Sequence, residues 1–102
     1  MSVQHITAET FEQEVIRSKE PVRLDFWATW CAPCRMLSPI LEEVADERPD
    51  VKVCKVNIDE APELAQQYRI VSIPTMLVIR DGQVEGKLVG YRPKDDILEL
   101  LE

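Results

Sequence analysis

Apolar residues along this chain follow two spacings, one typical of β-strands and the other typical of α-helices. Residues 22–27 and 51–58 are apolar at most positions, as expected of central strands that are buried on both faces. Between them, apolar residues recur three, four, seven and eight positions after Leu37, which places them on one face of a helix. The pattern therefore predicts a strand, a helix and a second strand in succession.

Two shorter segments extend this pattern. Residues 3–6 predict a short strand, and Thr7 can cap a following helix that has Phe11 and Val15 on its apolar side. Residues 60–68 predict another short helix. Helical and extended segments thus alternate along the chain, which is typical of a sheet covered by helices.

A hairpin and a helix are predicted at the C-terminal end. The dipeptide Asp81-Gly82 is a strong hairpin signal and lies between predicted strands over 75–80 and 83–89. A last helix is predicted over 94–101. The order β-α-β-α-β-α-β-β-α indicates an α/β fold, in which helices flank a mixed sheet of about five strands.

Length and charge narrow the class of protein. The 102 residues fit one domain over 1–102. The 12 basic residues against 19 acidic ones give a net charge of −7, which works against binding nucleic acid or anionic membranes. No apolar stretch is long enough to span a bilayer, and the first residues do not resemble a signal peptide. We therefore expect a cytoplasmic protein, and nothing in the sequence indicates more than a monomer.

The most informative motif is Trp30-Cys31-Ala32-Pro33-Cys34, between a predicted strand and a predicted helix. Two cysteines three positions apart at the start of a helix lie within bridging reach of each other. The helix N-terminus also favours a thiolate over a thiol. Cys31, nearer the loop, is expected to be the more exposed thiol and the nucleophile, and Cys34 is expected to resolve the mixed disulfide.

A structural zinc site is the alternative interpretation of this motif. Zinc would need two further ligands, and the candidates, Cys54 and His5, lie on separate predicted strands without ligand-like spacing. We therefore favour redox chemistry and expect no metal. Cys54 is expected to be a small buried hydrophobic residue, and His5 receives no role.

Three further residues are candidates to act with the cysteines. Asp25 lies in an apolar strand, either exposed at its edge or buried with a raised pKa and able to accept the proton of Cys34. Lys55, in another apolar strand, is a candidate partner for it. Pro74 precedes a strand, either as a simple strand start or in a cis peptide of a tight turn facing the cysteines. The residues alone leave these alternatives open.

Taken together, these motifs resemble the thioredoxin family. The similarity is carried by Asp25-Phe26-Trp27-Ala28, Trp30-Cys31-x-Pro33-Cys34-Arg35-Met36, Pro39, Lys55-Val56-Asn57-Ile58-Asp59, Ile73-Pro74-Thr75, Asp81-Gly82 and Val89-Gly90. It runs essentially from end to end of the chain. The resemblance implies the thioredoxin fold, an α/β fold with a central five-stranded mixed sheet and four helices distributed over both faces.

The resemblance also implies a role for each candidate. It makes Cys31 the nucleophile and Cys34 the resolving cysteine of a redox-active disulfide. It makes Asp25 the buried acid with Lys55 beside it, and Pro74 the cis-proline packed against the disulfide. A substrate groove would be lined by Trp30, Ala32, Pro33, Ser72, Ile73, Pro74 and Gly90. The implied substrates are disulfide-containing proteins, and the electrons would come from NADPH through thioredoxin reductase, with no cofactor bound to the chain itself.

Ala32 departs from the family pattern, because thioredoxins usually have Gly at this position. The dipeptide between the cysteines tunes the redox potential in this family, so Ala32 bears on the potential and on the fit to the reductase. Two other functions compete with reduction, a thiol oxidase or disulfide isomerase on the same fold and a binding module that uses the fold as a scaffold. The first often carries a histidine in the dipeptide, and the second would not need both cysteines. We therefore predict a protein-disulfide reductase.

Overall fold

The computed structural model describes residues 3–100. Within that range, a five-stranded sheet is flanked by four helices, which confirms the predicted α/β fold class and the order of its elements. The elements are β1 (Gln4–His5), η1 (Glu12–Ile16), β2 (Val22–Trp27), α1 (Ala32–Glu47), β3 (Lys52–Asn57), α2 (Pro62–Gln67), β4 (Thr75–Arg80), β5 (Gln83–Val89) and α3 (Lys94–Leu100).

The strands lie in the order β1-β3-β2-β4-β5, with β2 at the centre. β1 and β2 both pair with β3 in parallel, whereas β4 is antiparallel to β2 and to β5. The register places Asp25 of β2 opposite Lys55 of β3 on one side and Met76 of β4 on the other. A strand with neighbours on both sides is shielded along its length, and β2 is buried from Val22 to Phe26.

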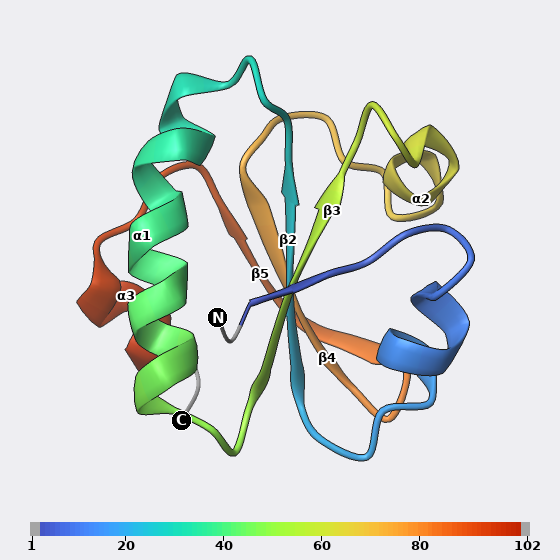
Figure 1. Cartoon of the computed structure of the whole chain (residues 1–102), viewed down its shortest axis with the longest axis horizontal. Coiled ribbons are helices and arrows are strands. Elements are labelled where there is room, and N and C mark those ends of the chain that lie inside the picture. Colours follow the sequence, from blue (N-terminus) through green and yellow to red (C-terminus); the bar gives the residue numbers. More distant parts are fainter. Residues whose placement is uncertain (1–2, 101–102) are drawn as a thin grey trace.

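Helices cover both faces of this sheet, with α1 and α3 on one face and η1 and α2 on the other (Figure 1). Side chains alternate along a strand, so β2 contributes to both faces. Its residues Val22, Leu24 and Phe26 belong to the apolar cluster that includes Phe11, Val15, Ala61 and Leu64 from the η1 and α2 side. The opposite face packs against α1 and α3 through Leu37, Leu41, Val44, Ala45, Val51, Val53, Met76 and Ile97.

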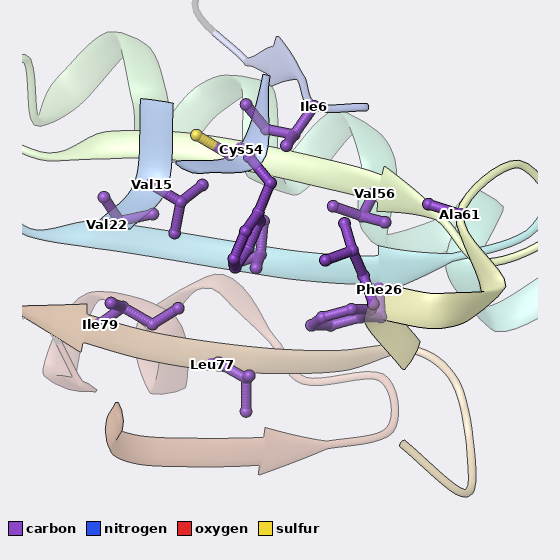
Figure 2. Packing of buried hydrophobic residues seen from close by; sticks show 12 residues of the cluster. Ile6, Val15, Val22, Phe26, Cys54, Val56, Ala61, Leu77 and Ile79 are labelled. Atoms are coloured by element: carbon purple, nitrogen blue, oxygen red, sulfur yellow. The ribbon is translucent and has the colours of Figure 1, made fainter. Parts of the chain in front are cut away.

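Cys54 lies inside the first of these clusters, as Figure 2 shows. Its side chain has no exposed surface, and it is a free thiol. Burial raises the pKa of this thiol to about 12, because the charged thiolate is poorly solvated in an apolar surrounding. The prediction of a buried hydrophobic cysteine is confirmed.

The helix predicted after Thr7 begins later than expected. η1 starts at Glu12 with Phe11 at its N-cap, and no side chain caps it. The Thr7 hydroxyl instead accepts a hydrogen bond from the Thr10 N–H, and the Thr10 hydroxyl accepts one from the Thr7 N–H. These reciprocal bonds have the form of a capping box over the turn of residues 8–10, and Phe11 after it already has helical dihedral angles, so Thr7 caps the turn that leads into the helix. The predicted end of the last helix, Leu101, lies outside the described residues.

The turn of the β4–β5 hairpin provides a test of what a side chain costs at a position with positive φ. Asp81 and Gly82 both have positive φ, +53° and +76°. Glycine adopts a positive φ without steric cost, aspartate tolerates it, and most other residues are strained by it. We predict that Gly82→Ala lowers the free energy of unfolding by about 1 kcal/mol, measured by urea denaturation. The control is Gly86→Ala in the same hairpin, where φ is not positive and a new Cβ would meet Val78 at an ordinary contact distance of 3.4 Å. Equal losses in the two variants would contradict this interpretation.

Candidate active site

Cys31 and Cys34 form a disulfide at the N-terminus of α1, with their Cα atoms 5.3 Å apart. Cys31 is the N-cap residue, with an extended backbone, and its Sγ accepts a hydrogen bond of 3.3 Å from the Cys34 N–H. A helix N-terminus leaves such N–H groups unpaired and carries a partial positive charge, so this position stabilises negative charge on the Cys31 sulfur. In this oxidised state both cysteines are buried. Cys31 is 5% exposed and Cys34 is 3% exposed, so Cys31 is only slightly more exposed than Cys34.

The loop that presents the disulfide is held by its own backbone and by one arginine. The Cys31 N–H donates to the Ala28 carbonyl oxygen at 3.3 Å, and Ala28 is fully buried. The Arg35 guanidinium reaches back from the first turn of α1 and donates to the Thr29 carbonyl oxygen at 2.9 Å. These bonds join the end of β2 to the start of α1.

A second loop lies against the disulfide from the start of β4. The Ile73–Pro74 peptide bond is cis, so of the two alternatives for Pro74 the cis peptide is confirmed. The Ile73 carbonyl oxygen lies 3.8 Å from the Cys31 Sγ. The Thr75 hydroxyl donates to the Ser72 carbonyl oxygen at 2.7 Å, which closes the turn. The Gly90 N–H donates to the Pro74 carbonyl oxygen at 2.7 Å, and this bond brings the end of β5 to the same place.

An apolar pocket opens beside this loop. It is lined by Trp30, Ile58, Ile70, Val71, Ser72 and Ile73. Trp30 is 65% exposed, and its indole N–H donates to the Asp59 carboxylate at 2.9 Å, which fixes the ring at the rim. Val71 is 93% exposed, far more than a valine in a typical surface position. Ala32 and Pro33 are also exposed, between the two cysteines.

Several lining residues were missed by the sequence analysis. Ile70 and Val71 lie between predicted elements, where apolar residues have no periodicity to reveal them. Ile58 was predicted as the last residue of the strand over 51–58, but the structure places it just after β3. The available signal was Ile70-Val71, an apolar pair in a short connection next to Pro74. Of this pair, Ile70 packs partly against the apolar cluster around Phe26, whereas Val71 is exposed and indicates a contact surface.

Asp25 is buried on the α1 face of the sheet, and the strand-edge alternative is wrong. Its side chain is 1% exposed, and its Oδ1 has no hydrogen-bond partner. Burial raises the pKa of this carboxyl from its ordinary value of 3.8 to about 7, and the charge of Lys55 opposes the rise. The group therefore changes protonation state close to neutral pH.

Lys55 is itself nearly buried, at 9% exposed. Its Nζ lies 4.5 Å from the centroid of the Trp27 ring and donates to the Ser38 hydroxyl at 3.3 Å. Ser38 was missed by the sequence analysis. The available signal was the spacing of Ser38, four residues after Cys34 on a helix, which places both residues on one face.

Residues 3–100 contain no cluster of three or more histidine, cysteine or acidic side chains that could hold a metal ion. In the same range, no helix combines the length and the apolar character that crossing a membrane requires.

A reversible disulfide that caps a helix, with a buried carboxyl able to exchange a proton near neutral pH, is suited to exchange with other disulfides. Together with the mixed sheet and the cis-proline loop, it defines the class of thiol-disulfide oxidoreductases. Comparison with known proteins agrees, since the thioredoxin family profile matches residues 2–102. The chain belongs to the thioredoxin family.

Individual relatives support the same conclusion. The chain is 47% identical to thioredoxin of Listeria monocytogenes, over 97% of this chain and 95% of the relative. It is 49% identical to thioredoxin 1 of Synechococcus elongatus, over 95% and 92% of the two chains. It is 44% identical to thioredoxin of Mycobacterium bovis, over 94% and 84%. Its activity is the reduction of protein disulfides.

The pKa of Asp25 predicts how stability depends on pH. The folded protein keeps the Asp25 proton up to pH about 7, whereas the unfolded chain releases it near 3.8. Raising the pH through this interval therefore favours the unfolded state. We predict that Asp25→Asn raises the free energy of unfolding at pH 8 by up to about 4 kcal/mol, and much less at pH 4. Urea denaturation of both oxidised proteins at the two pH values measures this, and a gain that is the same at both would contradict the prediction.

Proposed function

We propose that Cys31 attacks the substrate disulfide and that Cys34 resolves the intermediate. The Cys31 thiolate attacks one substrate sulfur, the substrate S–S bond breaks, and a mixed disulfide forms while the departing thiolate takes up a proton. The Cys34 thiolate then attacks the Cys31 sulfur, which breaks the mixed disulfide and releases the second substrate thiolate. Two electrons and two protons pass to the substrate, and the Cys31–Cys34 disulfide forms. The observation that carries this assignment is the position of Cys31 at the N-cap of α1.

Asp25 is the group that we assign to accept the proton of Cys34 in the second step. A general base works best when its pKa lies near the operating pH, and the pKa of Asp25 is about 7. Lys55 acts with it, because its positive charge favours the carboxylate form. The burial of Asp25 supports this role, since a proton released by Cys34 has little water nearby to receive it.

Substrate binding is assigned to the surface around the disulfide. The proposed contacts are Trp30, Ala32, Pro33, Ser72, Ile73, Pro74 and Gly90. An extended substrate segment would pair with backbone groups of Ser72 and Ile73, as a strand adds to a sheet. The exposed Trp30 ring and the apolar pocket beside it support this placement, because exposed apolar surface marks a binding site.

The remaining assignments concern the cellular setting. We infer that residues 1–102 act as one thioredoxin domain and as a monomer in the cytoplasm. The chain would carry electrons from NADPH by way of thioredoxin reductase to disulfide-containing proteins, as a part of redox homeostasis. The net charge of −7 supports a role without nucleic acid or anionic membranes as partners.

These assignments predict distinct defects for the cysteine variants. In an assay with NADPH, thioredoxin reductase and insulin as the substrate, Cys31→Ser should abolish turnover. Cys34→Ser should instead accumulate a mixed disulfide with the substrate, which non-reducing electrophoresis detects. The matched control is Cys54→Ala, which removes a buried thiol outside the site and should retain turnover.

Two outcomes would contradict parts of the proposal. Turnover that persists in Cys31→Ser would exclude this residue as the nucleophile. Activity of the unmodified chain with dithiothreitol but not with the reductase would show that the proposed electron donor is wrong, while the exchange chemistry stands.

A further inference from the structure

Ser38 lies one helical turn beyond Cys34 on α1, on the side that faces the sheet. Residues four apart on a helix stack on one face, so Ser38 lies directly beyond the resolving cysteine. Its hydroxyl accepts a hydrogen bond of 3.3 Å from the Lys55 Nζ. This bond connects α1 to β3 beside the buried Asp25, and the mechanism described above gives Ser38 no part.

The ammonium group of Lys55 has few other contacts that hold it inside the protein. It faces the Trp27 ring at 4.5 Å, and His5 of β1 packs edge-on against the same ring with centroids 6.4 Å apart. Although Asp25 is opposite Lys55 in the register, the described residues show no ion pair between them within 4.0 Å. Lysine has a long flexible stem and a strongly hydrated head, so an ammonium that loses its polar partner turns toward water.

The surroundings of Asp25 make it sensitive to the position of this ammonium. From β4 it faces Met76, an apolar residue, and from β3 it faces Lys55. α1 contributes the Cys31–Cys34 disulfide, which does not titrate, and the neutral Ser38. Within residues 3–100, Lys55 is the charged group that acts on the Asp25 carboxyl, and it opposes the effect of burial.

We propose that Ser38 is a positioning residue, whose hydroxyl holds the Lys55 ammonium inside the protein where its charge acts on Asp25. Without the hydroxyl, the ammonium turns toward solvent, and the interaction between the two charges weakens as the distance and the surrounding dielectric constant rise. Asp25 then binds its proton more tightly. The inference rests on the proposed role of Asp25 as proton acceptor and adds to it a residue that sets the pH at which Asp25 can act.

The test is the pKa of Asp25 in the oxidised protein, measured by NMR titration of its carboxyl carbon in four variants. In Ser38→Ala the pKa should rise, with proton affinity increasing by about twofold or more. In Ser38→Thr, which keeps the hydroxyl, it should stay near that of the unmodified chain. In Lys55→Met, a further Ser38→Ala substitution should cause no additional change, because the ammonium through which Ser38 acts is absent.

Each other result would overturn the inference. An unchanged pKa in Ser38→Ala would show that the hydroxyl does not hold Lys55, and a lowered pKa would show that it holds the ammonium away from Asp25. An equal rise in the Lys55→Met background would mean that Ser38 acts on Asp25 without Lys55. Because the titration needs no turnover, a failure of the insulin assay would count against the proposed function and leave this measurement interpretable.

Discussion

The burial of one carboxyl group beneath the disulfide is the constraint on which the rest of this site depends. A carboxylate is far better solvated by water than by an apolar interior, so the buried Asp25 keeps its proton until the pH is near neutral. A polar group buried without a partner costs roughly 1–3 kcal/mol, and the Asp25 Oδ1 has none. The apolar clusters on both faces of the sheet offset this cost and keep water away from the carboxyl.

The sheet topology explains how distant segments meet at these sulfurs. β2 and β3 are parallel, so their C-terminal ends lie at one edge of the sheet, where α1 begins. β4 is antiparallel to β2, so its N-terminal end, with Pro74 and Thr75, lies at that same edge. β5 is antiparallel to β4, which brings Val89 and Gly90 there as well. A change in the direction of β4 alone would carry the cis-proline loop to the opposite edge, away from the cysteines.

Hydrophobic spacing and turn motifs predicted the helices and strands well, whereas they could not predict contacts between residues far apart in the sequence. The hydrophobic run of β2 and the Asp81-Gly82 turn determine structure within a few residues, and the bounds of β2, β4 and β5 agree with the prediction. The start of the first helix was predicted too early, because the turn capped by Thr7 and Thr10 and the first turn of a helix look alike in sequence. The bond from Lys55 to Ser38 joins residues 17 positions apart on a strand and a helix, so only the packed fold reveals it.

Under the proposed function the two cysteines respond to two different electrostatic sources, the α1 N-terminus for Cys31 and the Asp25 carboxyl for Cys34, and water weakens these two sources to different extents. Cys31 lies at the helix N-terminus next to the exposed dipeptide, where salt and solvent screen the helix dipole. The carboxyl of Asp25 acts in the interior, where screening is weak. Ala32 is the first residue of α1, a helical position that alanine favours, so its methyl group adds no backbone strain. Because the Ala32 side chain is exposed between the two cysteines, under the proposed function its methyl group would meet partner proteins at the surface, whereas the buried Asp25 would set the pH response.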